Sequence, residues 1–365
     1  MRIRTASSTV EEFALTRPYA IALQEVTSSF GNVIVRIESD SGLTGLGAAS
    51  PGEHVTGETI EACREALSAE RLAWLSGRDA RTLPALCREA GERILRAPAA
   101  LAAVDMALHD LLAQHLGVPL VDMLGRAHEA LATSITIGIK PIDETLAEAD
   151  EYLGRGFRIL KVKTGNSLEE DVARLAKLRE RVGQGVTIRA DANQGYSPEE
   201  TARFFERAAW LDIEFLEQPV PRGDFDRARR TLPADWRRRI AADESLHDEK
   251  DALLLAAPEP ACGIYNIKLM KCGGLRPALR IAAIAETAGI ALMWGCMDES
   301  RISIAAALHA AFASPATRYL DLDGSLDLAR DVVEGGFRLD GGVLRTLDAP
   351  GLGLTESRGG RRGAA

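Results

Sequence analysis

The sequence lacks the features that mark a secreted, membrane-spanning or zinc-stabilised protein. Its five cysteines are an odd number, are widely spaced and form no Cys-x-x-Cys pair, which argues against a disulfide framework or a zinc site. No window approaches the roughly 20 apolar residues that a membrane-spanning helix needs. The segment Met1–Thr5 has no apolar core of the kind that a signal peptide carries. We therefore expect a soluble protein of the cytoplasm with no membrane partner.

The sequence also has no excess of positively charged residues. The 44 lysines and arginines are outnumbered by 53 acidic residues, which gives a net charge of −9. Proteins that bind nucleic-acid backbones generally need the opposite balance, so we expect no nucleic-acid partner. The 365 residues suffice for one large barrel and a smaller domain. We expect a homo-oligomer that acts on a small molecule.

From about residue 130 the chain alternates short apolar strands with helical segments. This alternation favours right-handed parallel crossovers, and eight such units close a barrel. The eight strand candidates are Ser134–Ile139, Ile159–Lys163, Val186–Asp191, Ile213–Glu217, Ile240–Asp243, Ile264–Lys268, Ile290–Gly295 and Tyr319–Leu322. They place a barrel domain at residues 126–325.

The residues on either side of the barrel have a different pattern. Residues 1–125 mix the apolar strand Val33–Ile37 with helical stretches at about 57–74 and 99–116, which is typical of an α+β domain. After the eighth strand a hairpin around Gly341-Gly342 replaces a long helix. We expect residues 326–357 to return to the N-terminal domain. The Gly/Arg-rich residues 358–365 are expected to be disordered.

Ionisable side chains stand at the carboxyl ends of nearly all the predicted strands. Active sites of such barrels lie at these ends. Loop charges and helix caps explain one or two such residues, but not a charge at seven of eight strands. The residues are Lys161, Lys163, Asp191, Glu217, Asp243, Lys268, Asp298, Asp321 and Asp323.

Three of the carboxylates, Asp191, Glu217 and Asp243, follow neighbouring strands and should converge. They would repel one another unless a cation neutralised them. Because the set contains oxygen ligands without histidine or cysteine, it favours a hard ion, and we expect Mg²⁺.

Two lysines, Lys163 and Lys268, follow strands that lie across the ring from each other. They would approach a central substrate from opposite faces. Because each lies beside a divalent ion and other cations, we expect lowered pKa values, which suit a neutral amine for proton abstraction.

These segments, taken together and in order, resemble the enolase superfamily, muconate-lactonising subgroup. The matching pieces are Lys161-Val162-Lys163, Asp191-Ala192-Asn193, Glu217-Gln218-Pro219, Ala242-Asp243-Glu244-Ser245, Asn266-Ile267-Lys268, and Pro119-Leu120 with Leu124-Gly125. The resemblance spans almost the whole chain. It implies a (β/α)7β barrel under an α+β capping domain with a mobile loop at about 16–31.

The resemblance also implies a chemistry. Mg²⁺ would be bound by Asp191, Glu217 and Asp243, and the proton α to a carboxylate would be removed to form an enediolate. Lys163 and Lys268 would be the two acid/base residues, with Lys161 supporting the charge at the site.

The pair Asp321 and Asp323 narrows the substrate. Alone, an Asp-x-Asp at a strand end is more often a solvated turn. On the eighth strand, however, it lies across the barrel from the metal cluster, and two carboxylates there require a cation. A dipeptide has the required groups: a carboxylate at one end, an acidic Cα–H beside it and an ammonium at the other end. The pair resembles that of the dipeptide epimerases, which implies 1,1-proton transfer at the C-terminal residue, L,L to L,D.

The side chain that the substrate carries at the epimerised position depends on other residues of the protein. Ala-Glu epimerases resemble this chain but carry an arginine where Gln24 stands, and Gln24 cannot pair with a glutamate side chain. Asp298 places an acidic group just past the seventh strand. Our hypothesis is a cationic or uncharged residue at the epimerised position. We include Met297 and Thr136 among the substrate-binding residues.

Other functions remain open from the sequence. An o-succinylbenzoate synthase, a muconate cycloisomerase or an N-acylamino acid racemase would share the lysines and metal ligands, but their substrates carry no ammonium. A sugar-acid dehydratase usually places a catalytic histidine where Lys268 and the segment Cys296–Asp298 stand. A binding protein would need no opposed bases.

Overall fold

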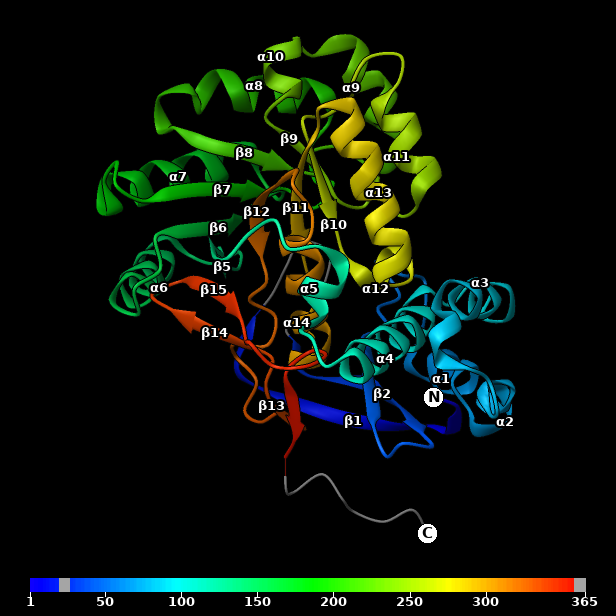
Figure 1. Cartoon of the computed structure of the whole chain (residues 1–365). Coiled ribbons are helices and arrows are strands. Elements are labelled where there is room, and N and C mark those ends of the chain that lie inside the picture. The colour runs from blue at the N-terminus through cyan, green and yellow to red at the C-terminus, as the bar shows by residue number, and fades with distance from the viewer. Residues whose placement is uncertain (20–26, 358–365) are drawn as a thin grey trace.

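A computed structural model, which describes residues 1–19 and 27–357, shows a parallel barrel with an N-terminal cap packed against one side of it (Figure 1). Eight parallel strands are hydrogen-bonded in the order β12-β11-β10-β9-β8-β7-β6-β5. A bridge between Thr133 and Leu320, with a 3.1 Å hydrogen bond from Ser134 N to Leu320 O, brings the first and last strands together. The strands are β5 (Ile135–Ile137), β6 (Ile159–Lys163), β7 (Thr187–Asp191), β8 (Ile213–Glu217), β9 (Ile240–Ala242), β10 (Ile264–Ile267), β11 (Ala291–Gly295) and β12 (Thr317–Asp321). The predicted barrel is confirmed.

Helices follow the strands and surround the barrel (Figure 1). A representative one, α7 (Leu168–Val182), begins where the Ser167 side chain accepts from Glu170 N and ends before Gly183, which has a φ of 70°. The others are α6 (Ile142–Gly154), α8 (Pro198–Arg207), α9 (Phe225–Thr231), α10 (Ala234–Arg237), α11 (Glu249–Ala256), α12 (Leu269–Cys272), α13 (Leu275–Ala288) and α14 (Arg301–Phe312). Short 3-10 turns lie at Ala209–Leu211 and Arg222–Asp224.

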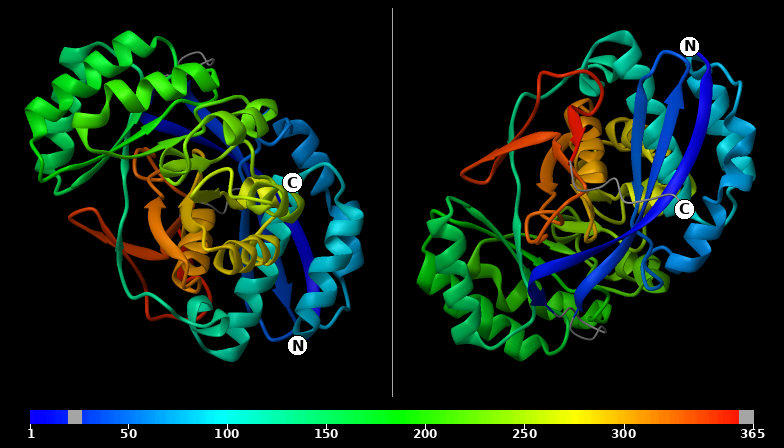
Figure 2. Two further views of the ribbon diagram at one scale, coloured as in Figure 1. Left: turned by 90° about the horizontal axis from the view of Figure 1, so that it is seen from above. Right: turned by 90° about the horizontal axis from the view of Figure 1, so that it is seen from below.

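The N-terminal cap is an antiparallel sheet covered by helices. Strands β1 (Ile3–Tyr19), β2 (Thr27–Ser39) and β3 (Thr44–Ala49) pair in that order, and the long helix α4 (Pro98–Leu116) packs on β3. The remaining helices are α1 (Ile60–Ala66), α2 (Ala69–Leu72), α3 (Leu83–Arg93) and α5 (Leu120–Leu124), with 3-10 turns at Ala73–Leu75 and Ala80–Thr82. Figure 2 shows β1 and β2 reaching from the cap toward the first barrel helices. The cap therefore extends over the barrel edge.

The C-terminal segment contacts both parts of the molecule. The hairpin of β14 (Phe337–Asp340) and β15 (Val343–Thr346) pairs with β4 (Leu131–Ala132), just ahead of the barrel. The strands β13 (Val333–Gly335) and β16 (Leu354–Glu356) form a separate pair, and a 2.6 Å ion pair joins Glu356 to Arg36 of β2. The β14–β15 hairpin thus forms a small sheet with β4 beside the barrel. The C-terminal residues that follow the hairpin contact the cap.

The described helices show no candidate for a membrane span, because none combines the necessary length with sufficient apolar character. Residues 358–365, expected to be disordered, lie outside the described part of the chain.

Candidate active site

Most of the functional side chains predicted from the sequence line one cavity between the barrel and the cap. Asp191 and Glu217 are fully buried and contact Lys161, which lines that cavity. The cavity has a volume of about 430 Å³. Its barrel wall comes from strand ends and the loops that follow them. Its cap wall includes Leu15, Arg17 and Phe30 of the β1–β2 ribbon and the loop 50–55. Both parts of the molecule therefore shape the site.

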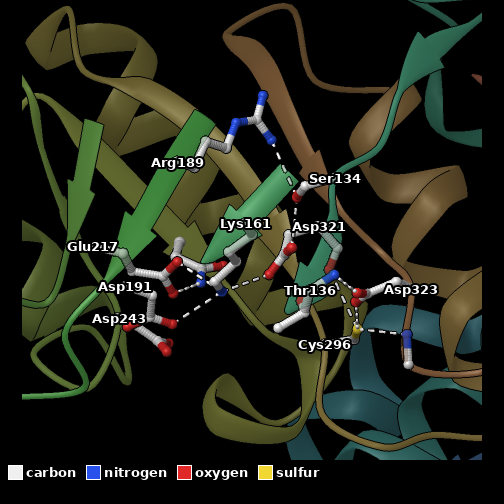
Figure 3. Close-up of polar contacts among 12 residues, drawn as sticks. Ser134, Thr136, Lys161, Arg189, Asp191, Glu217, Asp243, Cys296, Asp321 and Asp323 are labelled. Atoms are coloured by element: carbon white, nitrogen blue, oxygen red, sulfur yellow. Dashed lines mark hydrogen bonds and ion pairs between the residues drawn. The ribbon is translucent and has the colours of Figure 1, made fainter. Parts of the chain in front are cut away.

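The three predicted metal ligands lie at the ends of adjacent strands and are buried (Figure 3). Asp191 ends β7, Glu217 ends β8 and Asp243 follows β9. Burial, and then the charge of Asp191, raises the pKa of Glu217 to about 8. Burial would also raise the pKa of Asp191, but the ammonium groups of Lys163 and Lys161 lower it to about 2. Glu217 thus holds a proton far more readily than Asp191 within the same cluster.

Four lysines reach these carboxylates. The Lys161 Nζ lies 2.8 Å from Glu217 Oε2 and 3.1 Å from Asp191 Oδ2, and Lys163 Nζ lies 2.7 Å from Asp191 Oδ2. On the other side, Lys268 Nζ and Lys271 Nζ lie 2.8 and 2.5 Å from the oxygens of Asp243. The cluster is therefore a dense network of opposite charges.

Lys163 and Lys268 come from β6 and the end of β10, four positions apart in the eight-stranded order. They therefore lie on opposite sides of the barrel, as predicted. Burial, the largest single effect, lowers the pKa of the Lys268 ammonium. The carboxylates of Asp243 at 2.8 Å, Glu217 and Glu244 together outweigh burial and leave the pKa well above its ordinary value. The predicted lowering of the lysine pKa values applies to the site with a divalent ion bound and stays a prediction.

The donor set fits a hard divalent cation such as Mg²⁺. All the candidate ligands are carboxylate oxygens, and Asn266 Nδ2 orients Glu217 with a 2.7 Å hydrogen bond to its Oε1. Two further oxygens on cavity-lining residues, Asn193 Oδ1 and Glu244 Oε2, are buried without a hydrogen-bond partner. Within the described ranges, the ligand atoms of the three carboxylates are not all within 4.8 Å of one another. Lys161 Nζ contacts both Glu217 and Asp191.

The eighth-strand aspartates line the same cavity. The Asp321 carboxylate contacts Lys161 Nζ at 2.7 Å and accepts a 2.6 Å hydrogen bond from Ser134 Oγ. Two residues on, Asp323 Oδ2 accepts a 2.8 Å hydrogen bond from the backbone N–H of Thr136. The predicted contact of Thr136 with the site is thus made through its backbone.

Three further residues, Met297, Asp298 and Gln24, were predicted to bind the substrate. Met297 and Asp298, which follow β11, line the cavity. Gln24 lies outside the described residues. Sequence reasoning missed Lys271, Ser134 and Arg189. Ser134 opens a predicted strand two residues before Thr136 and so faces the same side, which was an available signal.

A second cluster of ligand-type side chains, Cys87, Asp105 and His109, lies inside the cap. The side chains of this cluster have a structural role. Asp105 Oδ1 accepts from Leu275 N at 2.7 Å and so caps the start of α13, and burial raises the pKa of the Cys87 thiol. A protonated thiol and an occupied carboxylate make a poor metal site.

The fold and the site together define a barrel protein of the enolase type. A family model described as the mandelate racemase/muconate lactonizing enzyme N-terminal domain matches residues 4–125. A second, described as enolase C-terminal domain-like, matches residues 144–358. The chain belongs to the mandelate racemase/muconate-lactonising family of the enolase superfamily, as the sequence predicted.

Several relatives share nearly the full length. The chain is 62% identical over 354 residues to the L-Lys-D/L-Arg epimerase of Methylococcus capsulatus, covering 97% of this chain and 99% of that one. It is 55% identical over 355 residues to the L-Lys-D/L-Arg epimerase of Desulforapulum autotrophicum, with coverage of 97% and 99%. The crystal structure of the Methylococcus capsulatus dipeptide epimerase complexed with Mg and L-Arg-D-Lys matches with a TM-score of 0.95 and 62% identity, over 97% of this chain and 100% of that one.

Proposed function

We propose that this chain is a Mg²⁺-dependent dipeptide epimerase that inverts the α-carbon of the C-terminal residue, converting L,L- to L,D-dipeptides. One observation carries the proposal. A single cavity has lysines on opposite sides, Asp243 of the carboxylate cluster, and a separate aspartate pair at the end of β12. The first two features suit two-sided proton transfer, and the third suits a substrate ammonium. The names of the similar relatives support the same reaction.

In this reaction Lys163 and Lys268 exchange the α-proton from opposite faces. One lysine takes the proton at its Nζ, and the other delivers a proton to the opposite face of the same carbon. Mg²⁺ held by Asp191, Glu217 and Asp243 would neutralise the negative charge that develops beside the substrate carboxylate. Lys161 Nζ, already between Glu217 and Asp191, adds positive charge at that end.

We propose a cationic side chain on the substrate, because the cavity wall supplies acidic groups and the two relatives described above are named L-Lys-D/L-Arg epimerases. Asp298, Asp327 and Glu148 line the cavity in addition to the β12 pair. An L-Ala-L-Glu substrate would place its side-chain carboxylate among these groups.

The reaction is tested by incubating a dipeptide library with the purified protein and Mg²⁺ in D₂O. We expect one deuterium at the α-carbon of the C-terminal residue, with the fastest exchange for lysine- and arginine-containing dipeptides. The variants Lys163→Ala and Lys268→Ala should each lose epimerisation by about 10²–10⁴-fold. Each should retain slow exchange of one stereoisomer through the remaining lysine.

The library distinguishes the alternatives. A binding protein would give no deuterium, and a dehydratase or cycloisomerase would change substrate mass or connectivity. Faster turnover of L-Ala-L-Glu than of every cationic dipeptide would contradict the specificity. Full activity in either lysine variant would contradict the two-base assignment.

The cellular compartment and the oligomeric state of the protein also belong to this proposal. Five free cysteines in the described chain suit a reducing compartment, and we propose a cytoplasmic homo-oligomer. Size-exclusion chromatography with light scattering tests the assembly.

A further inference from the structure

The main chains of the two opposed lysines are held in different ways. The carbonyl of Lys268 accepts hydrogen bonds from Lys271 N at 3.0 Å and from Cys272 N at 3.3 Å, at the start of α12. These contacts use backbone atoms alone. The carbonyl of Lys163, in contrast, accepts a 2.6 Å hydrogen bond from Nη2 of Arg174 on α7. The support of Lys163 therefore depends on a particular side chain outside the barrel strands.

Arg174 belongs to a small buried network around Asp171, which stands three residues earlier on the same helix. Asp171 Oδ1 accepts a 2.8 Å hydrogen bond from Arg174 Nη2. Its Oδ2 accepts from the backbone N–H of Gly165 at 2.8 Å and from the hydroxyl of Tyr196 at 2.7 Å. The side chains of Asp171, Arg174 and Tyr196 are all buried, and we call these three residues the Asp171 network. Because its members are buried and one is charged, loss of one member leaves the others without a partner.

The segment that follows Lys163 has little room to move. Thr164 N donates to Asp191 O of β7 at 2.7 Å. Gly165 has a φ of 106°, and a Cβ there would lie 2.2 Å from the carbonyl oxygen of Ala192. The end of β6 is therefore packed tightly on β7, and the Asp171 network holds it from the helix side.

We propose that Asp171, Arg174 and Tyr196 are positioning residues for proton transfer by Lys163, and that they act on this face of the substrate alone. The inference rests on the proposed function and adds to it. The three residues lie behind the strand rather than on the cavity wall, so they act through the backbone of Lys163. A reacting nitrogen displaced by about 1 Å can slow its step on the order of a hundredfold.

A displaced Lys163 has a consequence that a general loss of stability does not have. Every inversion needs both lysines, so epimerisation slows in both directions. The stereoisomer whose α-proton faces Lys268 can still give that proton to Lys268 and, in D₂O, take a deuteron back from the same nitrogen. For this stereoisomer the ratio of exchange with retention to epimerisation rises. For the other stereoisomer, which must begin at Lys163, the ratio falls.

The experiment measures these two ratios at early times, from the L,L and the L,D form of one dipeptide in D₂O. Lys163→Ala first identifies the stereoisomer that faces Lys268, because only that form still exchanges. In Arg174→Gln, whose side chain is shorter and uncharged, the ratio for this stereoisomer should rise about tenfold. In Tyr196→Phe, which removes one hydrogen bond of the network, it should rise by a smaller factor.

The matched control is Arg179→Gln on the same helix. Arg179 is also buried and also donates to backbone carbonyls, those of Leu211 at 2.8 Å and Val186 at 2.7 Å. These carbonyls precede β8 and β7, at the opposite ends of the strands from the site. Arg179→Gln should lower stability in urea and leave both ratios at their wild-type values. Calorimetric titration of each variant sets a saturating Mg²⁺ concentration, so metal occupancy does not enter the comparison.

Wild-type ratios in Tyr196→Phe and in a folded Arg174→Gln would overturn the positioning role. A shift of both stereoisomers in the same direction, or an equal shift in Arg179→Gln, would also overturn it. If Arg174→Gln did not fold, Tyr196→Phe would decide alone. A wild-type protein that exchanged no dipeptide α-proton would contradict the proposed function itself, whereas normal wild-type epimerisation with unmoved ratios in the variants would contradict only the role of the Asp171 network.

Discussion

The ionisation of one carboxyl group, that of Asp323, should set the acid limb of the activity. Burial, and then the neighbouring charge of Asp321, raises its pKa to about 6. A raised carboxyl pKa means that the neutral form persists up to that pH, so the partner of the substrate ammonium is lost as the pH falls through 6. We expect kcat/KM for a dipeptide to fall about tenfold per pH unit below this value.

The measurement is a pH profile of kcat/KM between about pH 4.5 and 8. Asp323→Asn should have a lower plateau and should lack this limb. An N-acetylated dipeptide should also lack it in the wild-type protein. If the limb persisted unchanged in Asp323→Asn, another group would have to be responsible.

At the residue scale, the sequence identified the side chains that end strands, because alternation and strand order fix where they point. It missed Ser134 and Arg189. The position of Ser134 two residues before Thr136 indicated the side of the strand that it faces, but not its contacts with Asp321 and Arg189, which join residues far apart in the chain. Ser134 reaches Asp321 across 187 positions. The direct contact of Lys268 with Asp243, which raises the pKa of the lysine, could not be read from spacing either.

At the scale of elements, the strands were predicted well and the cap helices less well. The eighth strand runs from Thr317 to Asp321 rather than from Tyr319 to Leu322. The single helical stretch predicted at about 57–74 is divided, because Ser68 caps a new helix by accepting from Arg71 N. Side-chain capping of this kind competes locally with helix continuation and is hard to place from periodicity alone.

Two glycines of β3, Gly45 and Gly47, are required by packing. With Gly42 in the turn before β3 they have a spacing that faintly resembles a phosphate loop, but the structure gives these two a different role. A Cβ on Gly47 would lie 1.9 Å from Ala103 O of α4, and one on Gly45 would lie 2.1 Å from Ala107 O. These glycines allow the helix to lie directly on the strand.

Gly47→Ala should therefore destabilise the protein by about 1–3 kcal/mol, because α4 must move away from β3. Urea unfolding followed by circular dichroism measures the change. The control is Gly154→Ala at the end of α6, where a Cβ meets nothing within 4 Å. That variant should be neutral or stabilising by about 0.5–1 kcal/mol. Equal effects of the two substitutions would contradict the packing argument.

At the scale of the whole molecule, cap and barrel are joined by many polar contacts. Helix α4 of the cap caps barrel helix α13 through Asp105, and its Asp110 accepts from Leu352 N of the C-terminal segment at 2.8 Å. Arg17 of β1 makes 2.7 and 2.9 Å hydrogen bonds to Glu151 on barrel helix α6. The sequence predicted two domains but not these connections, which depend on how the domains meet.

Such connections should make the two domains unfold together, although proteins of this size often unfold in stages. Single-tryptophan variants that retain Trp74 in the cap or Trp294 in the barrel report each part separately. Their urea transitions should coincide. Asp105→Ala should shift both by the same amount and cost about 1–3 kcal/mol, because it leaves the start of α13 uncapped. Asp105→Asn keeps a capping oxygen and should cost much less. A Trp74 transition that preceded the Trp294 transition would show that the cap unfolds independently.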